Sequence, residues 1–169
     1  MRHLKKKYQT PIRPWDKQRL DSEREILNSF GLKNKRELWR TQASLRKYRQ
    51  IARGLQARSD KEKERLIIEK LVKMGILKDG SGLDDILSLK TQDFLERRLQ
   101  TVLQRKGAAN TIGHARQMIV HGHVKVGDRK ISYPSFVVSR GDEARIKVSL
   151  INPTKIVKKA EAKKVESDA

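Results

Sequence analysis

The chain has 169 residues, no cysteine, and 40 lysines and arginines against 20 aspartates and glutamates, which gives a net charge of +20. In the free protein these positive charges repel one another, and a polyanionic partner would relieve the repulsion. The partner could be a nucleic acid or an anionic membrane surface. Because we find no apolar run of about 18 residues, signal peptide or lipidation motif, the membrane is disfavoured. The lack of cysteine excludes a disulfide framework and fits the cytosol.

The charge is divided unevenly along the chain. Residues 1–59 hold 17 basic and 5 acidic residues, residues 94–150 hold 11 and 4, and residues 60–93 hold 7 and 8. A merely soluble surface would mix the two signs more evenly. We therefore divide the chain into a basic arm (1–15), a helical N-terminal domain (16–93), a basic module expected to bind nucleic acid (94–150) and a charged tail (151–169).

The first part of the chain predicts an extended arm followed by two helices. Residues 2–15 contain two prolines and no periodicity, which favours an arm over a helix. Residues 16–27 have the pattern of a short amphipathic helix, and Asn34 can cap a longer one. Trp39 could stack on a base, but such residues more often fill a core. The apolar side chains expected to face inward on the longer helix are Leu38, Trp39, Leu45, Ile51, Ala52 and Leu55.

Residues 60–85 predict a nearly neutral helical spacer between the two basic blocks. Leu66, Ile67, Leu71 and Met74 follow helical spacing, and Gly75 can end the helix. The glycines of the following loop indicate a turn rather than a phosphate-binding loop, because no strand precedes them. We expect this spacer to hold the two basic blocks at a fixed distance.

Residues 91–122 predict two amphipathic helices. Thr91 can cap the first and Gly107 can end it, whereas Thr111 can cap the second and Gly122 follows its end. The residues expected to face inward are Leu95, Leu99, Val102 and Leu103 on the first helix, and Ile112, Ala115, Met118 and Ile119 on the second.

The periodicity then changes from helical to that of strands. Residues 124–126 and 146–148 each place a lysine between two apolar residues, and Gly127-Asp128 and Gly141-Asp142 provide turns between the short strands. The chain is therefore predicted to be α+β, with a helical N-terminal part and a module of two helices packed on a small antiparallel sheet. An extended basic arm is expected before these parts and a mobile C-terminal tail after them.

Cations surround the apolar stripe of the module. Arg98 and Arg105 are seven residues apart and should share one flank of the first helix, with Arg97 pointing further out. Arg116 should border the core of the second helix. Most charged helix residues simply face water, but the excess of one sign favours contact with nucleic acid.

Two sets of residues are predicted to contact the nucleic acid. In the N-terminal part they are Lys5, Lys6, Lys7, Arg13, Arg36, Arg40, Arg46, Lys47, Arg49 and Arg53. In the module they are Arg97, Arg98, Arg105, Lys106, Asn110, Thr111, His114, Arg116, Gln117, His121, Lys125, Arg129 and Lys130.

The module resembles a known RNA-binding family. Its sequence contains ERRLQTVLQRKGAANTIGHARQMIVHGHVKVGDRKISYPSFVVSRGDEARI, with an Arg-Leu pair, a Gly, an Ala-Arg pair, then Gly-His-Val, a Pro and a Gly-Asp. This pattern is similar to the module named after the universal "S-four" protein of the small ribosomal subunit. Upstream, the chain has YQTPIRPWDKQRLDSEREILNSFGLKNKRELWR, which resembles the archaeal and eukaryotic form of that protein.

The resemblance implies a structural protein of the small ribosomal subunit in the cytoplasm. It would bind a multi-helix junction in the five-prime domain of small-subunit ribosomal RNA early in assembly. Neighbouring ribosomal proteins and the path of messenger RNA would lie close by, with an effect on decoding accuracy. The alternative is a stand-alone RNA chaperone of the heat-shock type, which the N-terminal basic block disfavours. A double-stranded-DNA architectural protein ranks third, because no dimer or base-reading feature is present.

The inventory of reactive residues argues against an enzyme. No nucleophile-elbow or Walker pattern occurs, and the pairs Asp84-Asp85 and Asp142-Glu143 fall where a turn or helix cap explains them. His121 and His123 have the spacing of a metal pair, but no cysteine or nearby acid offers a third ligand. We therefore expect no cofactor, no metal and no small-molecule substrate.

Overall fold

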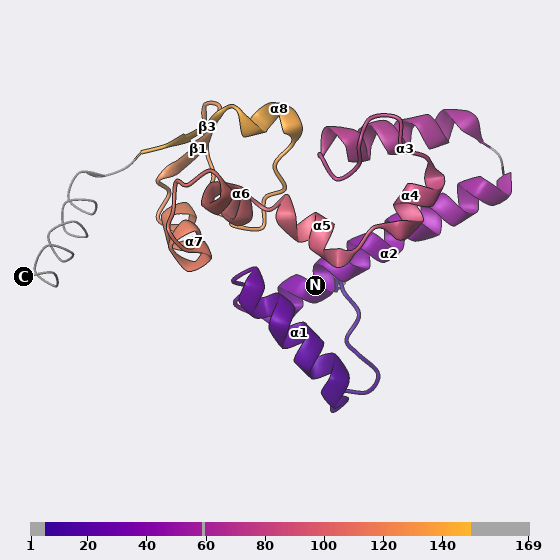
Figure 1. Cartoon of the computed structure of the whole chain (residues 1–169), viewed down its shortest axis with the longest axis horizontal. Helices are drawn as coiled ribbons and strands as arrows, with labels where there is room; N and C mark the ends of the chain where they lie inside the picture. The colour runs from indigo at the N-terminus through magenta and orange to yellow at the C-terminus, as the bar shows by residue number, and fades with distance from the viewer. Residues whose placement is uncertain (1–5, 59, 150–169) are drawn as a thin grey trace, which may run out of the picture.

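The computed structural model describes residues 6–58 and 60–149, so the predicted contact at Lys5 and the charged tail lie outside the described residues. Figure 1 shows the arrangement of the elements. In chain order they are α1 (Lys17–Ser29), α2 (Lys35–Arg58), α3 (Lys61–Lys73), α4 (Leu83–Ser88), α5 (Thr91–Glu96), α6 (Leu99–Arg105), α7 (Ile112–Val120), β1 (Val124–Val126), β2 (Arg129–Lys130), α8 (Arg140–Glu143) and β3 (Ile146–Val148).

The N-terminal domain is organised around the long helix α2, which begins directly after Asn34 as predicted. Its apolar face enters two separate clusters. One contains Leu32, Leu38 and Leu95, with side chains of α1 packed beside it. The other joins α2 to α3, α4 and α5, and its buried members are Leu45, Ala52, Leu71, Leu77, Ile86, Leu89 and Phe94.

The sequence predicts that the neutral helix α3 holds the two basic blocks at a fixed distance. It packs back against α2 (Figure 1), and the segment at its C-terminal end also meets the module, where Arg97 donates to the Met74 carbonyl and Arg140 to the Leu77 carbonyl. Gly75 ends the helix with a φ of 73°, as predicted. The expected inward position of Leu66 is wrong, since that residue is 65% exposed. The helix instead turns Ile67, Ile68 and Leu71 toward the cluster.

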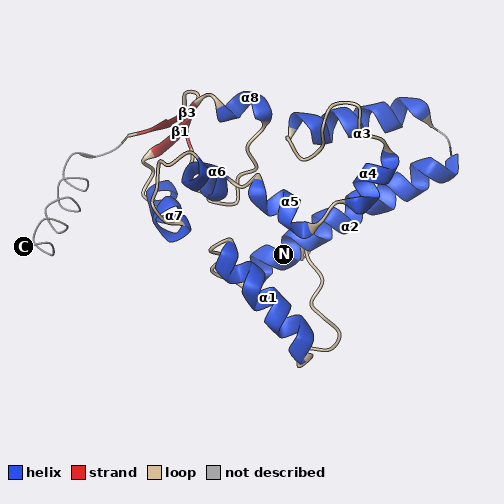
Figure 2. Cartoon of the chain, viewed as in Figure 1, coloured by secondary structure: helices blue, strands red, loops and turns tan. Residues whose placement is uncertain are grey.

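The module contains a three-stranded antiparallel sheet of order β2-β1-β3, seen at one end of the molecule in Figure 2. Val126 pairs with Arg129 across the β1–β2 hairpin, and Gly127 has the positive φ of 60° that this tight turn requires. The second predicted turn, at Gly141-Asp142, is instead the short helix α8. It forms because the Ser139 side chain accepts a hydrogen bond from the Asp142 N–H.

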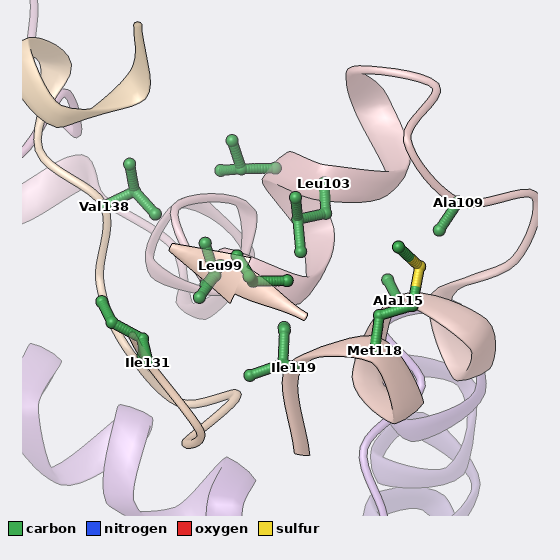
Figure 3. Close-up of a cluster of buried hydrophobic side chains, with 10 residues drawn as sticks. Leu99, Leu103, Ala109, Ala115, Met118, Ile119, Ile131 and Val138 are labelled. Carbon is green, nitrogen blue, oxygen red and sulfur yellow. The ribbon is translucent and has the colours of Figure 1, made fainter. Parts of the chain in front are cut away.

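Helices α6 and α7 pack together beside the sheet and form the core of the module with it. Figure 3 shows this cluster, in which Leu99, Leu103, Ala115 and Ile119 have no exposed surface. Thr111 caps α7 by accepting a hydrogen bond from the His114 N–H, as predicted.

The single helix expected over residues 91–107 is broken into α5 and α6. Arg98 between them is extended (φ −71°, ψ 143°), and the flanking backbone bonds to the segment before α8. The Leu99 N–H donates to the Phe136 carbonyl at 2.8 Å, and the Val138 N–H donates to the Arg97 carbonyl at 2.9 Å. Thr91 is not the cap but the first residue of α5. None of the helices in the described ranges has the length and apolarity to cross a lipid bilayer.

Candidate RNA-binding surface

One face of α2 carries a row of cations opposite its apolar face. Arg36, Arg40 and Lys47 fall within about 40° of one another at 100° per residue, and all three are exposed. Arg46 and Arg53 form a second exposed row beside them. None of these five makes an ion pair with a carboxylate in the part of the chain that the structure describes. We call these five residues the α2 basic face.

The end of the N-terminal arm lies over the α2 basic face. Gln9 accepts a hydrogen bond from the Arg46 guanidinium at 3.0 Å, and the Tyr8 ring lies 5.9 Å from that of Trp39. Lys6 and Lys7 therefore line a shallow depression together with α2 residues, which adds their charge to the same surface. Arg13, further along the arm, is exposed and shows no acidic partner among the described ion pairs.

Trp39 is half-buried at the junction of α1, α2 and the arm. Its indole N–H donates to Oε1 of Glu23 at 3.1 Å, and Glu23 is 4% exposed. Since both the ring and its polar edge are occupied, Trp39 has a packing role, as the sequence analysis favoured.

The module presents a second polar face on α7 and the β1–β2 hairpin. His114, Gln117 and His121 share the side of α7 that lies opposite its buried residues. Asn110 and Thr111 are exposed at its start, and the hairpin exposes Lys125, Arg129 and Lys130.

Two of the predicted RNA-contacting arginines turn inward to Glu37 of α2. Arg98 Nη2 donates to Glu37 Oε2 at 2.6 Å, and Arg116 Nη2 donates to Oε1 at 2.6 Å. Arg98 is 5% exposed, so the expectation that it shares a solvated flank with Arg105 is wrong. Burial lowers the pKa of Arg98, and the charge of Glu37 offsets this only in part. Arg105 itself is exposed and pairs with Glu96 at 3.1 Å.

Glu37 lies at the first turn of α2 and Arg116 on α7, so this ion-pair cluster joins the N-terminal domain to the module. Gln100, which is fully buried, extends the contact: its side-chain N–H donates to the Phe30 carbonyl at 2.6 Å, and its oxygen accepts from Arg116 at 3.3 Å. As a result, Arg40, which follows Glu37 on α2, lies beside the module and lines a pocket with Arg98 and Val137.

Three more predicted cations are engaged with the backbone of their own chain. Arg97 does not point outward as expected, because it donates to the carbonyls of Met74 and Val138 and pairs with Glu143 at 3.0 Å. Arg49 donates to the Leu89 carbonyl, and Lys106 to the Glu143 carbonyl. The last two were predicted as RNA contacts from charge alone, which does not distinguish a surface cation from one that caps a neighbouring carbonyl.

Three exposed residues with suitable chemistry were missed by the sequence analysis. Arg58 continues the row of Arg36, Arg40 and Lys47, and helical spacing alone could have identified it. Tyr133 and Arg145 line a depression of about 410 Å³ with the cations of the hairpin. Tyr133 is 54% exposed and meets the Phe136 ring edge-on at 5.8 Å. No local pattern indicates this arrangement, which forms only when residues 133–145 fold beside β2.

The described residues offer no constellation for metal chemistry. The rings of His121 and His123 lie 6.2 Å apart, but no group of three or more histidine, aspartate or glutamate side chains gathers there or elsewhere in residues 6–58 and 60–149. Asp84-Asp85 lies in the first turn of α4, where the Asp85 side chain accepts from the Gly82 N–H at 3.0 Å.

Comparison with known proteins gives a consistent picture. Residues 97–143 match the family model described as the S4 domain. The chain is 46% identical over 155 residues to the small ribosomal subunit protein uS4 of Picrophilus torridus, an alignment that covers 88% of this chain and 85% of the relative. It is 45% identical over 157 residues to uS4 of Sulfurisphaera tokodaii (89% and 88%) and 46% identical over 158 residues to uS4 of Sulfolobus acidocaldarius (91% and 90%).

Proposed function

Because the chain belongs to the uS4 family of small ribosomal subunit proteins, we propose that it binds the RNA of that subunit with two surfaces that act together. One is the α2 basic face with the arm beside it, and the other is the exposed face of α7 with the β1–β2 hairpin. The family is one of ribosomal proteins and not of enzymes, which agrees with the expectation from the sequence that the chain carries no catalytic motif.

The observation that carries this proposal is the α2 basic face. Its five cations have no carboxylate partners among the described residues, so their mutual repulsion is relieved best by phosphates. Cations that neutralise phosphates release counterions, and folded RNA is recognised mainly by its shape and backbone. Because Glu37 joins the start of α2 to α7, both surfaces belong to one folded unit and can clamp one RNA.

We extend the proposal with the finer points that the sequence resemblance implies. The RNA is a multi-helix junction in the five-prime domain of small-subunit ribosomal RNA, bound early in assembly. The protein contacts neighbouring ribosomal proteins, lies near the path of messenger RNA, and contributes to the accuracy of decoding by ribosomes in the cytoplasm.

The test compares the full chain with the variant Arg36→Gln/Arg40→Gln/Lys47→Gln. Binding to a five-prime-domain transcript and to a plain duplex is measured over a salt series. The variant should bind the transcript more weakly, and its affinity should depend less on salt. The slope of log K against log salt concentration should fall by roughly 0.9 for each duplex phosphate that the protein no longer neutralises. Lys61→Gln/Lys70→Gln/Lys73→Gln removes the same charge from exposed positions of α3 and serves as control. Equal losses of affinity in the two variants would contradict a specific surface, and equal wild-type affinity for both RNAs would favour the stand-alone chaperone.

A further inference from the structure

A pocket of about 180 Å³ lies where α2, the α5–α6 break and the segment before α8 meet. This volume is well above what a single water molecule needs. Its apolar wall is formed by Phe94 and Val137. Its polar wall carries two cations and one carboxylate, together with three hydroxyl groups: Arg40, Arg98, Glu37, Thr41, Ser44 and Ser135.

Arg98 lines this pocket, and one of its buried donors has no hydrogen-bond partner among the described residues. This donor is Nε, and Arg98 as a whole is only 5% exposed. Only Nη2 is engaged, by Glu37. A buried charged donor that lacks a partner destabilises the protein, since it has lost water without a replacement.

The charges around the pocket are also unbalanced. Glu37 is the one carboxylate within ion-pair distance of Arg98 in the described ranges, and it is shared with Arg116. Arg40 adds a third cation and has no acidic partner there. Two guanidinium groups therefore share the charge of Glu37, and Arg40 adds an unpaired one, so the excess of positive charge favours a further anion.

We propose that this pocket binds a backbone phosphate of RNA, with Arg98 and Arg40 as charged donors and the Ser135 hydroxyl as a neutral one. The inference rests on the proposed function and specifies a site within it. A phosphate is favoured over a protein carboxylate because Arg40 also belongs to the α2 basic face. An RNA strand that follows this face is thus led to the pocket, and the guanidinium fork matches the oxygens of a phosphate.

The first test follows the Arg side-chain N–H signals of the ¹⁵N-labelled full chain by NMR during titration with inorganic phosphate. The Arg98 Nε–H signal should shift with phosphate and remain unchanged with sodium chloride at equal ionic strength. Arg40→Gln should weaken phosphate binding about tenfold, which corresponds to the loss of one charge-assisted hydrogen bond. A silent Arg98 signal would overturn the proposal. So would an equal shift with acetate, which would assign the pocket to a carboxylate of a neighbouring protein.

The second test fills the pocket without removing a charge. Ser44→Leu places a bulky apolar side chain in it, whereas Gln56→Leu makes a comparable change at an exposed position of the same helix outside the pocket. We expect Ser44→Leu to weaken binding to the five-prime-domain transcript about tenfold, and Gln56→Leu to leave it unchanged. Wild-type affinity in Ser44→Leu would refute the phosphate site. If the wild-type chain itself fails to bind the transcript, the proposed function is wrong, and the phosphate titration still reports on the pocket separately.

Discussion

Removing the charge of Glu37 should destabilise the joint between the N-terminal domain and the module. Glu37 accepts from Arg98 and Arg116 at 2.6 Å each, and the three side chains are 16%, 6% and 21% exposed. Breaking a fully buried ion pair by removing one partner costs about 3 to 5 kcal/mol, and an exposed pair contributes about 0 to 1 kcal/mol. For this partly exposed cluster we expect Glu37→Gln to lower the free energy of unfolding by about 2 to 3 kcal/mol.

Urea unfolding followed by circular dichroism measures this effect. With a slope of about 2 kcal/mol per molar urea, the midpoint should fall by roughly 1 to 1.5 M. The control is Glu96→Gln, whose partner Arg105 lies at 3.1 Å and in which both side chains are about half exposed. This substitution should cost less than about 1 kcal/mol. If both variants lose the same stability, the reasoning that burial gives Glu37 its importance is refuted.

Three further predictions concern pH, the module core and the arm. Burial by itself would raise the pKa of Glu37, but the hydrogen bond from Arg116 and the charges of Arg98 and Arg116 outweigh burial and lower it from its ordinary value of 4.5. The ionised Glu37 therefore contributes its full stabilisation above the ordinary pKa, and this stabilisation is lost as the pH falls through the lowered pKa. Between about pH 5 and about pH 3 the free energy of unfolding should thus fall more for the wild type than for Glu37→Gln. Leu103→Ala, which truncates a side chain without exposed surface, should cost about 2 to 5 kcal/mol in a urea melt, and an effect under 1 kcal/mol would contradict its place in the core. Trypsin should cut after the exposed Arg13 in the isolated chain and not in the assembled subunit; protection in both states would count against an arm that RNA orders.

The long amphipathic helices are the part of the fold that could be predicted from local pattern. In α2 and α7 the apolar residues recur at helical spacing over several turns, and Asn34 and Thr111 mark where the helices begin. The same pattern continues through Leu95 and Leu99, so it could not reveal the break at Arg98. That break depends on hydrogen bonds to residues 136–138, which no local window includes.

The candidate site was predictable in composition but not in orientation. A cation on an amphipathic flank faces either solvent or an internal acid, and the acid that binds Arg98 lies 61 residues earlier in the chain. The shared face of Arg36, Arg40 and Lys47 follows from helical spacing alone, because it depends only on the helix itself. For Arg97 and Arg116 the answer depends on how separate elements pack.

Phe94 and Leu95 are neighbours in α5, yet each completes a different cluster of the N-terminal domain. During synthesis α2 therefore precedes by about 40 residues the last of the segments that cover its apolar face, an interval of roughly 2 to 8 s at 5 to 20 residues per second. In that interval the nascent helix presents uncovered leucines on one side and unneutralised arginines on the other. Chaperone capture and premature binding to RNA compete with folding until α5 arrives, so slow translation between residues 58 and 96 is expected to lower the yield of folded protein.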